Sequence, residues 1–118
     1  MIEAQLVAAL KSVVGANVYP DTAPVATQPP YVLWQGIGGA SQRYLDGSAS
    51  DKRQLRVQLS IWHSTRLAAL QAARDIEDAL CASTTFIARP EGEPINEAEP
   101  DLQRYGCVQT YLIWGQRT

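Results

Sequence analysis

The spacing of apolar residues changes in the middle of the chain from a period of two to a helical period. Over residues 55–62, apolar residues at the odd positions alternate with more polar ones, as in a strand that buries one face. After His63-Ser64-Thr65, apolar residues recur at helical spacing from Leu67 to Leu80, and most of the inward ones are alanine. We therefore predict a strand whose apolar face is closely covered by the helix that follows it.

The remaining elements are expected on both sides of this unit. Apolar spacing predicts one more helix at residues 2–14, and β-branched and aromatic runs predict three more strands, at residues 31–37, 84–89 and 102–114. The last strand should be central, with Gly106 allowing a bulge or a close approach. The predicted fold class is α+β, in the order α-β-β-α-β-β. We expect one domain over residues 1–118, an antiparallel or mixed four-stranded sheet packed by two helices.

Three segments between these elements are predicted to be irregular. Residues 18–30 are proline-rich, and we expect a stiff extended connector there, because proline fixes φ and cannot donate to a sheet. Residues 40–53 are polar and longer than a tight hairpin needs, so they are disordered, functional, or a distorted extension of the hairpin. Residues 90–101 carry five carboxylates and three prolines, which predicts an extended acidic loop.

Composition narrows the class of protein. The apolar fraction of 46% and the charged fraction of 19% are typical of a globular chain rather than a disordered one. A net charge of −2 argues against general or specific nucleic-acid binding, which needs a basic face. The N-terminal segment lacks a basic leader and reads as an amphipathic helix, and no run approaches the roughly twenty apolar residues that cross a bilayer. We therefore expect a cytoplasmic protein without membrane contact.

Candidate chemistry is sparse. His63 is the only histidine, so a His-pair metal site is excluded and any catalytic triad would depend on this one residue. It lies where the strand turns into the helix, beside Ser64 and Thr65, either of which could cap the helix. Cys81 and Cys107 fit no metal or redox spacing and are expected to be free thiols. We predict no catalytic residue, no metal and no cofactor.

Charged residues of the two long loops and of the second helix are the candidates for contacts with other proteins. Carboxylates near the end of a helix oppose its dipole unless basic groups compensate, so they are either solvated or paired with a neighbouring molecule. Eight of the ten basic residues are arginine, which is favoured in planar contacts to another protein. The candidate contact residues are Arg43, Tyr44, Asp46, Lys52, Arg53, Asp78, Glu91 and Glu93.

The order and spacing of several short motifs resemble a known family. They are Val18-Tyr19-Pro20, Pro30-Tyr31, and Arg56-Val57-Gln58 running into an alanine-rich helix that ends Ile-Glu-Asp-Ala-Leu. Together they resemble the tail-completion, or head-to-tail joining, proteins of long-tailed phages, which are similar in fold to the tail terminators of lambda-like phages. The resemblance covers about residues 2–114, and no single motif in it is a chemical signature.

The resemblance implies a non-enzymatic structural protein of a phage or prophage. Members of that family form a ring, typically hexameric, that caps the tail tube, stops its elongation and presents a surface to the head connector. The implied partners are further copies of the chain, the tail tube protein and the head connector or neck proteins. The implied location is the tail or neck of the virion, with assembly in the bacterial cytoplasm.

A head-to-tail ring needs two different, complementary surfaces on each subunit. We therefore expect the acidic loop, or the carboxylates near Asp78, to meet an arginine-bearing surface of a neighbouring subunit or of the tube. The alternatives are another ring protein of the neck, such as a head-completion or connector-adaptor protein, a small cytosolic enzyme, and a nucleic-acid-binding module.

Overall fold

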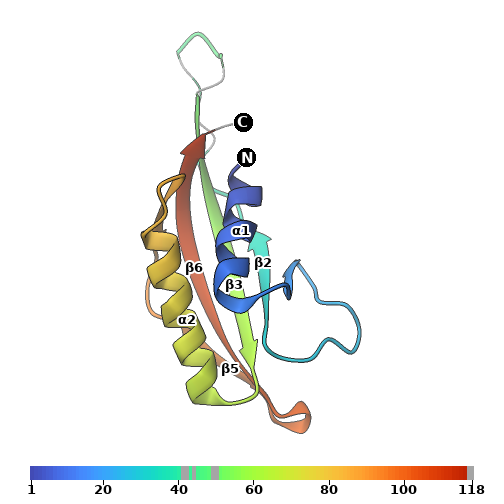
Figure 1. Cartoon of the computed structure of the whole chain (residues 1–118). Helices are drawn as coiled ribbons and strands as arrows, with labels where there is room; N and C mark the ends of the chain where they lie inside the picture. Colours follow the sequence, from blue (N-terminus) through green and yellow to red (C-terminus); the bar gives the residue numbers. More distant parts are fainter. Residues whose placement is uncertain (41–42, 44, 49–50, 117–118) are drawn as a thin grey trace.

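The computed structural model describes residues 1–40, 43, 45–48 and 51–116. Within these residues two α-helices and six strands form an α+β fold of two layers (Figure 1). The elements are α1 (Ile2–Val14), β1 (Val18–Pro20), β2 (Tyr31–Gly36), β3 (Lys52–His63), α2 (Arg66–Cys81), β4 (Phe86–Pro90), β5 (Ile95–Glu99), the short 3-10 helix η1 (Pro100–Leu102) and β6 (Arg104–Gln116). The predicted fold class is confirmed, while the number of strands and their order are corrected.

The sheet is built around two long antiparallel strands. β3 and β6 pair along their whole lengths, from Lys52 opposite Gln116 to His63 opposite Tyr105. The strand order is β1-β2-β3-β6-β4, and β5 pairs with β6 beyond the end of β4. β1 runs parallel to β2, so the sheet is mixed. The predicted central position of the last strand is confirmed.

Two strands lie in segments that were predicted to be irregular. β1 occupies the start of the proline-rich connector, where Pro20 is tolerated because the strand is short and lies at an edge. β5 occupies the acidic segment. β6 has 13 residues and β4 only 5, so the rest of β6 would leave its backbone unpaired without β5. Between the two edge strands, residues 91–94 bulge out from the sheet, because they lie opposite only residues 109–110 of β6.

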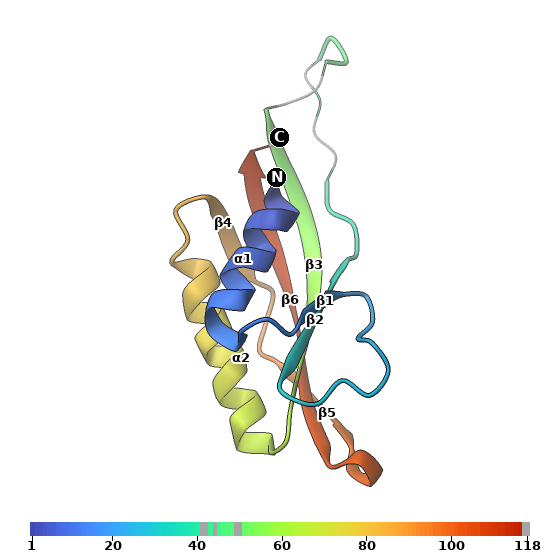
Figure 2. The same cartoon turned by 45° about the vertical axis from the view of Figure 1, so that its right-hand side comes forward.

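Both helices cover the same face of the sheet, and the core lies between the layers (Figures 1 and 2). The predicted alternation in β3 is confirmed, because Val57, Leu59 and Ile61 are buried on the helix side. Ala69 and Ala73 of α2 are also buried, as expected of a closely packed helix, whereas Leu67, predicted to begin its apolar side, is 79% exposed. The other core residues are Ile2, Leu6, Leu10, Val18, Val32, Ile76, Leu80, Phe86, Cys107, Tyr111 and Ile113.

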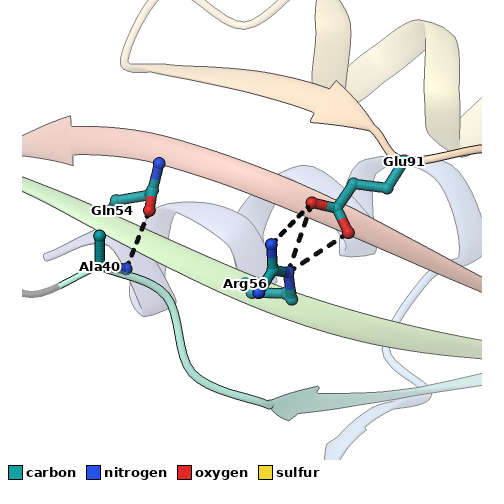
Figure 3. A network of polar contacts seen from close by, with 4 residues as sticks. All are labelled: Ala40, Gln54, Arg56 and Glu91. Atoms are coloured by element: carbon teal, nitrogen blue, oxygen red, sulfur yellow. Dashed lines mark hydrogen bonds and ion pairs between the residues drawn. The ribbon is translucent and has the colours of Figure 1, made fainter.

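Two glycines are required by close approaches. A Cβ on Gly106 would lie 2.8 Å from the indole ring of Trp62, so the predicted close approach is confirmed, and the pairing with β3 continues through it without a bulge. Gly39 has φ +123°, and a Cβ there would lie 2.6 Å from the carbonyl oxygen of Gln54. After β2 the chain still follows β3, since the Ala40 amide donates to the Gln54 side chain at 2.8 Å (Figure 3). Residues 37–40 therefore extend the hairpin in distorted form.

The molecule is elongated, measuring 54 × 27 × 23 Å. Its radius of gyration of 15.1 Å exceeds the roughly 13.5 Å expected of a compact chain of this length. The β2–β3 loop lies at one end of the long axis and the β5–β6 turn at the other (Figure 1). The loop of residues 21–30 projects sideways, away from α2. These projections give the molecule two distinct ends and two distinct edges.

Candidate interface surfaces

The sheet face opposite the helices carries a polar band. Among the described residues no helix lies on this face, and an ion pair crosses it (Figure 3). The guanidinium of Arg56 on β3 donates to both carboxylate oxygens of Glu91 at 3.1–3.3 Å, spanning β6. Both side chains are partly exposed, at 42% and 29%, so the pair adds little stability. Its geometric effect is to tie the bulge between β4 and β5 to the centre of the sheet.

The edge formed by β4, residues 91–94 and β5, here the acidic edge, is fastened by Arg66. This residue begins α2, after the Thr65 side chain caps the helix by accepting from the Ala68 amide at 3.2 Å. The Arg66 guanidinium lies 5.6 Å from the centre of the Tyr105 ring and donates to the carbonyls of Gly106, at 2.6 Å, and Glu97. A cation at a helix N-terminus opposes the helix dipole. The stacking of Arg66 on Tyr105 and its hydrogen bonds to the two carbonyls explain why an arginine occupies this position despite the dipole.

The opposite edge, formed by β1, residues 21–30 and β2, here the low-charge edge, is fastened by Arg104. Its guanidinium lies 5.8 Å from the centre of the Tyr31 ring. It donates to the Tyr31 hydroxyl at 3.3 Å and to the Thr27 carbonyl at 3.0 Å. This edge is chemically unlike the other one, because Asp21 is the only charged residue between Lys11 and Arg43.

A tight turn stands out from the low-charge edge. Thr27 closes it, because its amide and its hydroxyl both donate to the Pro24 carbonyl, at 3.2 and 2.7 Å. Ala26 has φ +68°, a left-handed conformation that costs a residue with a Cβ of order 1–2 kcal/mol. Val25 is 100% exposed at the tip. We call residues 24–27 the Val25 turn.

A cleft of about 360 Å³ lies between α2 and the acidic edge. Its lining residues are Leu70, Ala73, Arg74, Glu77, Glu93, Pro94, Asn96 and Gln109. Behind it runs a buried network, in which Gln109 donates to Glu77 at 3.0 Å and to the Gly92 carbonyl at 2.9 Å, and accepts from the Tyr111 hydroxyl at 3.1 Å. Burial, reinforced by the nearby Glu77, raises the pKa of Tyr111. We call this cavity the α2 cleft.

The predicted contact residues are divided between roles within the subunit and positions on its surface. Arg53 forms an ion pair at 3.2 Å with Glu3 in the first turn of α1, and Glu91 binds Arg56. These two side chains therefore support the subunit itself. Lys52 begins β3 at the sheet end and lies 2.7 Å from the Gln116 amide oxygen when that amide faces it.

The other predicted contact residues remain at the surface, apart from Tyr44, which lies outside the described residues. Arg43 and Asp46 are exposed in the β2–β3 loop, and hydrogen bonds from the Ser48 hydroxyl and amide lower the pKa of Asp46. Asp78 is exposed on α2, and Glu93 is exposed beside the α2 cleft. The structure thus does not gather the eight residues into one site.

The groups that were considered for chemistry have structural partners. The His63 ring accepts from the backbone amide of Ser64 at 2.9 Å. Burial raises the pKa of both cysteine thiols, and the carboxylates Glu77 and Asp78 raise that of Cys81 further. The described residues include no group of three metal-ligating side chains and no helix long and apolar enough to span a bilayer.

Comparison with known protein families identifies the family of this chain. The family model described as "Tail completion protein gp17" matches residues 4–113. The chain belongs to the phage tail-completion family. This membership confirms the resemblance drawn from the spacing of its motifs and gives the protein a structural role as a component of the virion tail. A comparison of this tail-completion protein with curated sequences found no match.

The sequence analysis missed the residues that organise the edges of this tail-completion protein. Arg66 and Arg104 were not singled out, because stacking on a tyrosine 39 or 73 positions away leaves no local pattern. Val25 was assigned to a stiff extended connector and was not considered as a contact residue. A usable signal existed in the long interval between Lys11 and Arg43, which carries the single charge of Asp21, since protein interfaces are depleted of charge at their centres.

Proposed function

We propose that this tail-completion protein acts as one domain that forms a ring, of about six copies, at the end of the tail tube. The ring stops elongation of the tube and joins the tail to the head. The observation that carries this proposal, beyond family membership, is the asymmetry of the elongated subunit. A subunit with unlike ends and unlike edges suits a ring that binds different partners above and below.

The two ends differ in charge. The β2–β3 end presents charges of both signs, from Arg43, Lys52, Asp46 and Asp51, while the β5–β6 end presents the carboxylates Glu97, Glu99 and Asp101. When subunits stand side by side with the same polarity, the mixed-charge end of one does not face the acidic end of the next. The charged ends then serve the tube and the head connector, and the edges serve the neighbouring subunits. Asp78 and Glu93 lie on the α2 side, so we assign them to contacts with neighbouring subunits.

Charge reversal separates these roles. We expect Arg43→Glu at one end, or Asp101→Lys at the other, to leave the mass of the ring unchanged while weakening attachment to one axial partner. The measurements are the mass of the assembled species by light scattering and the length of tails completed in vivo. Lys11→Glu, on the exposed side of α1, is the matched control. Normal attachment and tail length in both end variants would contradict the axial assignment.

The same mass measurement tests the ring itself and the alternative functions. A discrete species of about six subunits, alone or after addition of tail tubes, supports the ring. A stable dimer through the sheet faces contradicts it and favours a binding module or an enzyme. A ring that binds isolated head connectors but never tail tubes identifies another protein of the neck.

A further inference from the structure

We propose that the Val25 turn is a preformed anchor that inserts into the α2 cleft of the neighbouring copy of this chain. The inference rests on the proposed ring and names the contact that closes it. It differs from the charge-based contact expected from the sequence, because its centre is apolar and rigid.

The turn is fixed before any partner binds. The two hydrogen bonds from Thr27 to Pro24 close it, and Arg104 holds the Thr27 carbonyl against the body of the subunit. Pro24 restricts the backbone on entry to the turn. A rigid loop loses little conformational entropy on binding, so its contact energy appears as affinity. The arrangement therefore suits a docking element.

Two features of the turn are unfavourable in an isolated subunit. Ala26 adopts φ +68°, which favours glycine, and Val25 is fully exposed at the tip. A strained residue persists only where the surrounding structure imposes it, and such residues concentrate at functional positions. Burial of Val25 in a partner would remove its apolar side chain from water, and the free energy gained would offset the backbone strain at Ala26.

The rest of the low-charge edge suits a protein partner. Over the interval from Lys11 to Arg43 the chain carries one charge, Asp21. Protein interfaces exclude charge from their centres and keep it at the rim. A nucleic acid would require several exposed cations here. This interval supplies none, and the Arg104 guanidinium at the same edge is already engaged by Tyr31 and Thr27.

The second copy is favoured as the occupant because the receiving surface lies on the other edge of the same subunit. The turn projects away from α2 (Figures 1 and 2), whereas the α2 cleft is lined by α2 and by Glu93, Pro94 and Asn96 of the acidic edge. A contact between opposite edges repeats from one subunit to the next and closes a ring if the rotation allows it. A contact between identical edges would stop at a dimer.

The lining of the cleft matches the turn. Leu70, Ala73 and Pro94 offer apolar surface for the valine, and the Asn96 side chain can bond the exposed backbone of the turn. Arg74 at the cleft is opposite in charge to Asp21 near the base of the loop. Glu77 is already engaged by Gln109, which leaves Glu93 as the acidic group of the cleft that faces the uncharged tip of the turn.

Substitution at the tip tests the contact. We expect Val25→Asp to weaken assembly of the ring at least about tenfold, as loss of a buried anchor does. Val25→Thr, which keeps the shape, should cost less. Leu45→Asp is the matched control for assembly without tail tubes, because Leu45 is as exposed as Val25 but lies at the end of the molecule that the proposed ring reserves for an axial partner. The measurement is the concentration dependence of mass by sedimentation, with and without tail tubes.

Disulfide trapping identifies the partner surface. In a Cys81→Ser background, Val25→Cys combined with Glu93→Cys should give a ladder of cross-linked species that ends at the ring. Leu45→Cys combined with Glu93→Cys should not. Cross-linking no greater than in this control, or a Val25→Asp variant with normal ring mass, would overturn the proposal while leaving the ring intact.

Other outcomes are equally decisive. If Val25→Asp assembles normally but no longer caps tail tubes, the turn binds the tube rather than a second copy, and the proposal is wrong. A wild type that stays monomeric with and without tubes contradicts the ring and this contact together. The folded state of each variant is checked by its thermal unfolding midpoint.

Discussion

The two edges of the sheet are fastened by the same device but present opposite surfaces. At each edge an arginine stacks on a tyrosine and donates hydrogen bonds to backbone carbonyls or to the tyrosine hydroxyl. Arg66 fastens the acidic edge to the start of α2, and Arg104 fastens the low-charge edge to the start of β6. The comparison shows that edge geometry and edge chemistry are set independently. One kind of clamp holds a carboxylate-rich strand on one side and, on the other, a loop whose single charge is Asp21.

The largest effect is expected from Arg66→Ala. The variant loses two charge-assisted hydrogen bonds to carbonyls and one cation–π contact, which together stabilise the fold by about 3 kcal/mol. Removing the cation also relieves its opposition to the helix dipole, which offsets roughly 0.5 kcal/mol. Urea unfolding measures the change, and hydrogen exchange should quicken in β5 and the start of β6. Arg66→Lys keeps the charge but not the planar fork. Wild-type exchange in β5 would show that Arg66 does not fasten this edge.

A smaller effect on stability, but a larger one on assembly, is expected from Arg104→Ala. One of its two hydrogen bonds goes to an exposed loop, so we expect a cost of about 2 kcal/mol. The Val25 turn then loses its attachment to the body of the subunit, and ring formation should weaken further than stability alone explains. Urea unfolding and sedimentation measure the two effects on the same samples. If Arg66→Ala weakened ring assembly as much as Arg104→Ala does, the Val25 turn would have no special role in assembly compared with the acidic edge.

Alkaline pH should act on the acidic edge through the network behind the α2 cleft. Burial raises the pKa of Tyr111, and a raised folded pKa means that the unfolded chain releases its proton first. This stability is fully present below the unfolded pKa of about 10 and is lost above it, by up to about 1.4 kcal/mol per pH unit. The raised pKa of Cys107 starts a similar decline near pH 8.5.

Tyr111→Phe isolates the tyrosine in this pH dependence. At neutral pH the variant should lose about 1–2 kcal/mol, because the buried Gln109 carbonyl oxygen loses its donor. Above pH 10 its unfolding free energy should fall less steeply than that of the wild type. Urea unfolding at pH 8, 10 and 11 makes the comparison. If the unfolding free energies of the two proteins fell in parallel with pH, Tyr111 would not be the cause of the alkaline destabilisation.

The periodicity of apolar residues predicted those helices and strands whose structure depends on the residues of one segment alone. The alternation in β3, the alanine face of α2 and the apolar stripe of α1 each follow from a periodicity within one segment, and each is confirmed. The family also followed from the order of short motifs and is confirmed by the match over residues 4–113. Thr65 as the helix cap was one of two local candidates, and the structure selects it.

Tertiary structure decided the elements and contacts that depend on distant partners. β5 has little strand propensity of its own and exists because β6 is longer than β4 and offers an unpaired backbone. Arg53 and Glu91 looked like surface charges, but Glu3 and Arg56, 50 and 35 residues away, bind them. The sequence by itself determined the fold class, the family and the elements with internal periodicity. Only the folded chain decided which charges are engaged within the subunit and which edge carries few of them, because those depend on pairings that no local pattern encodes.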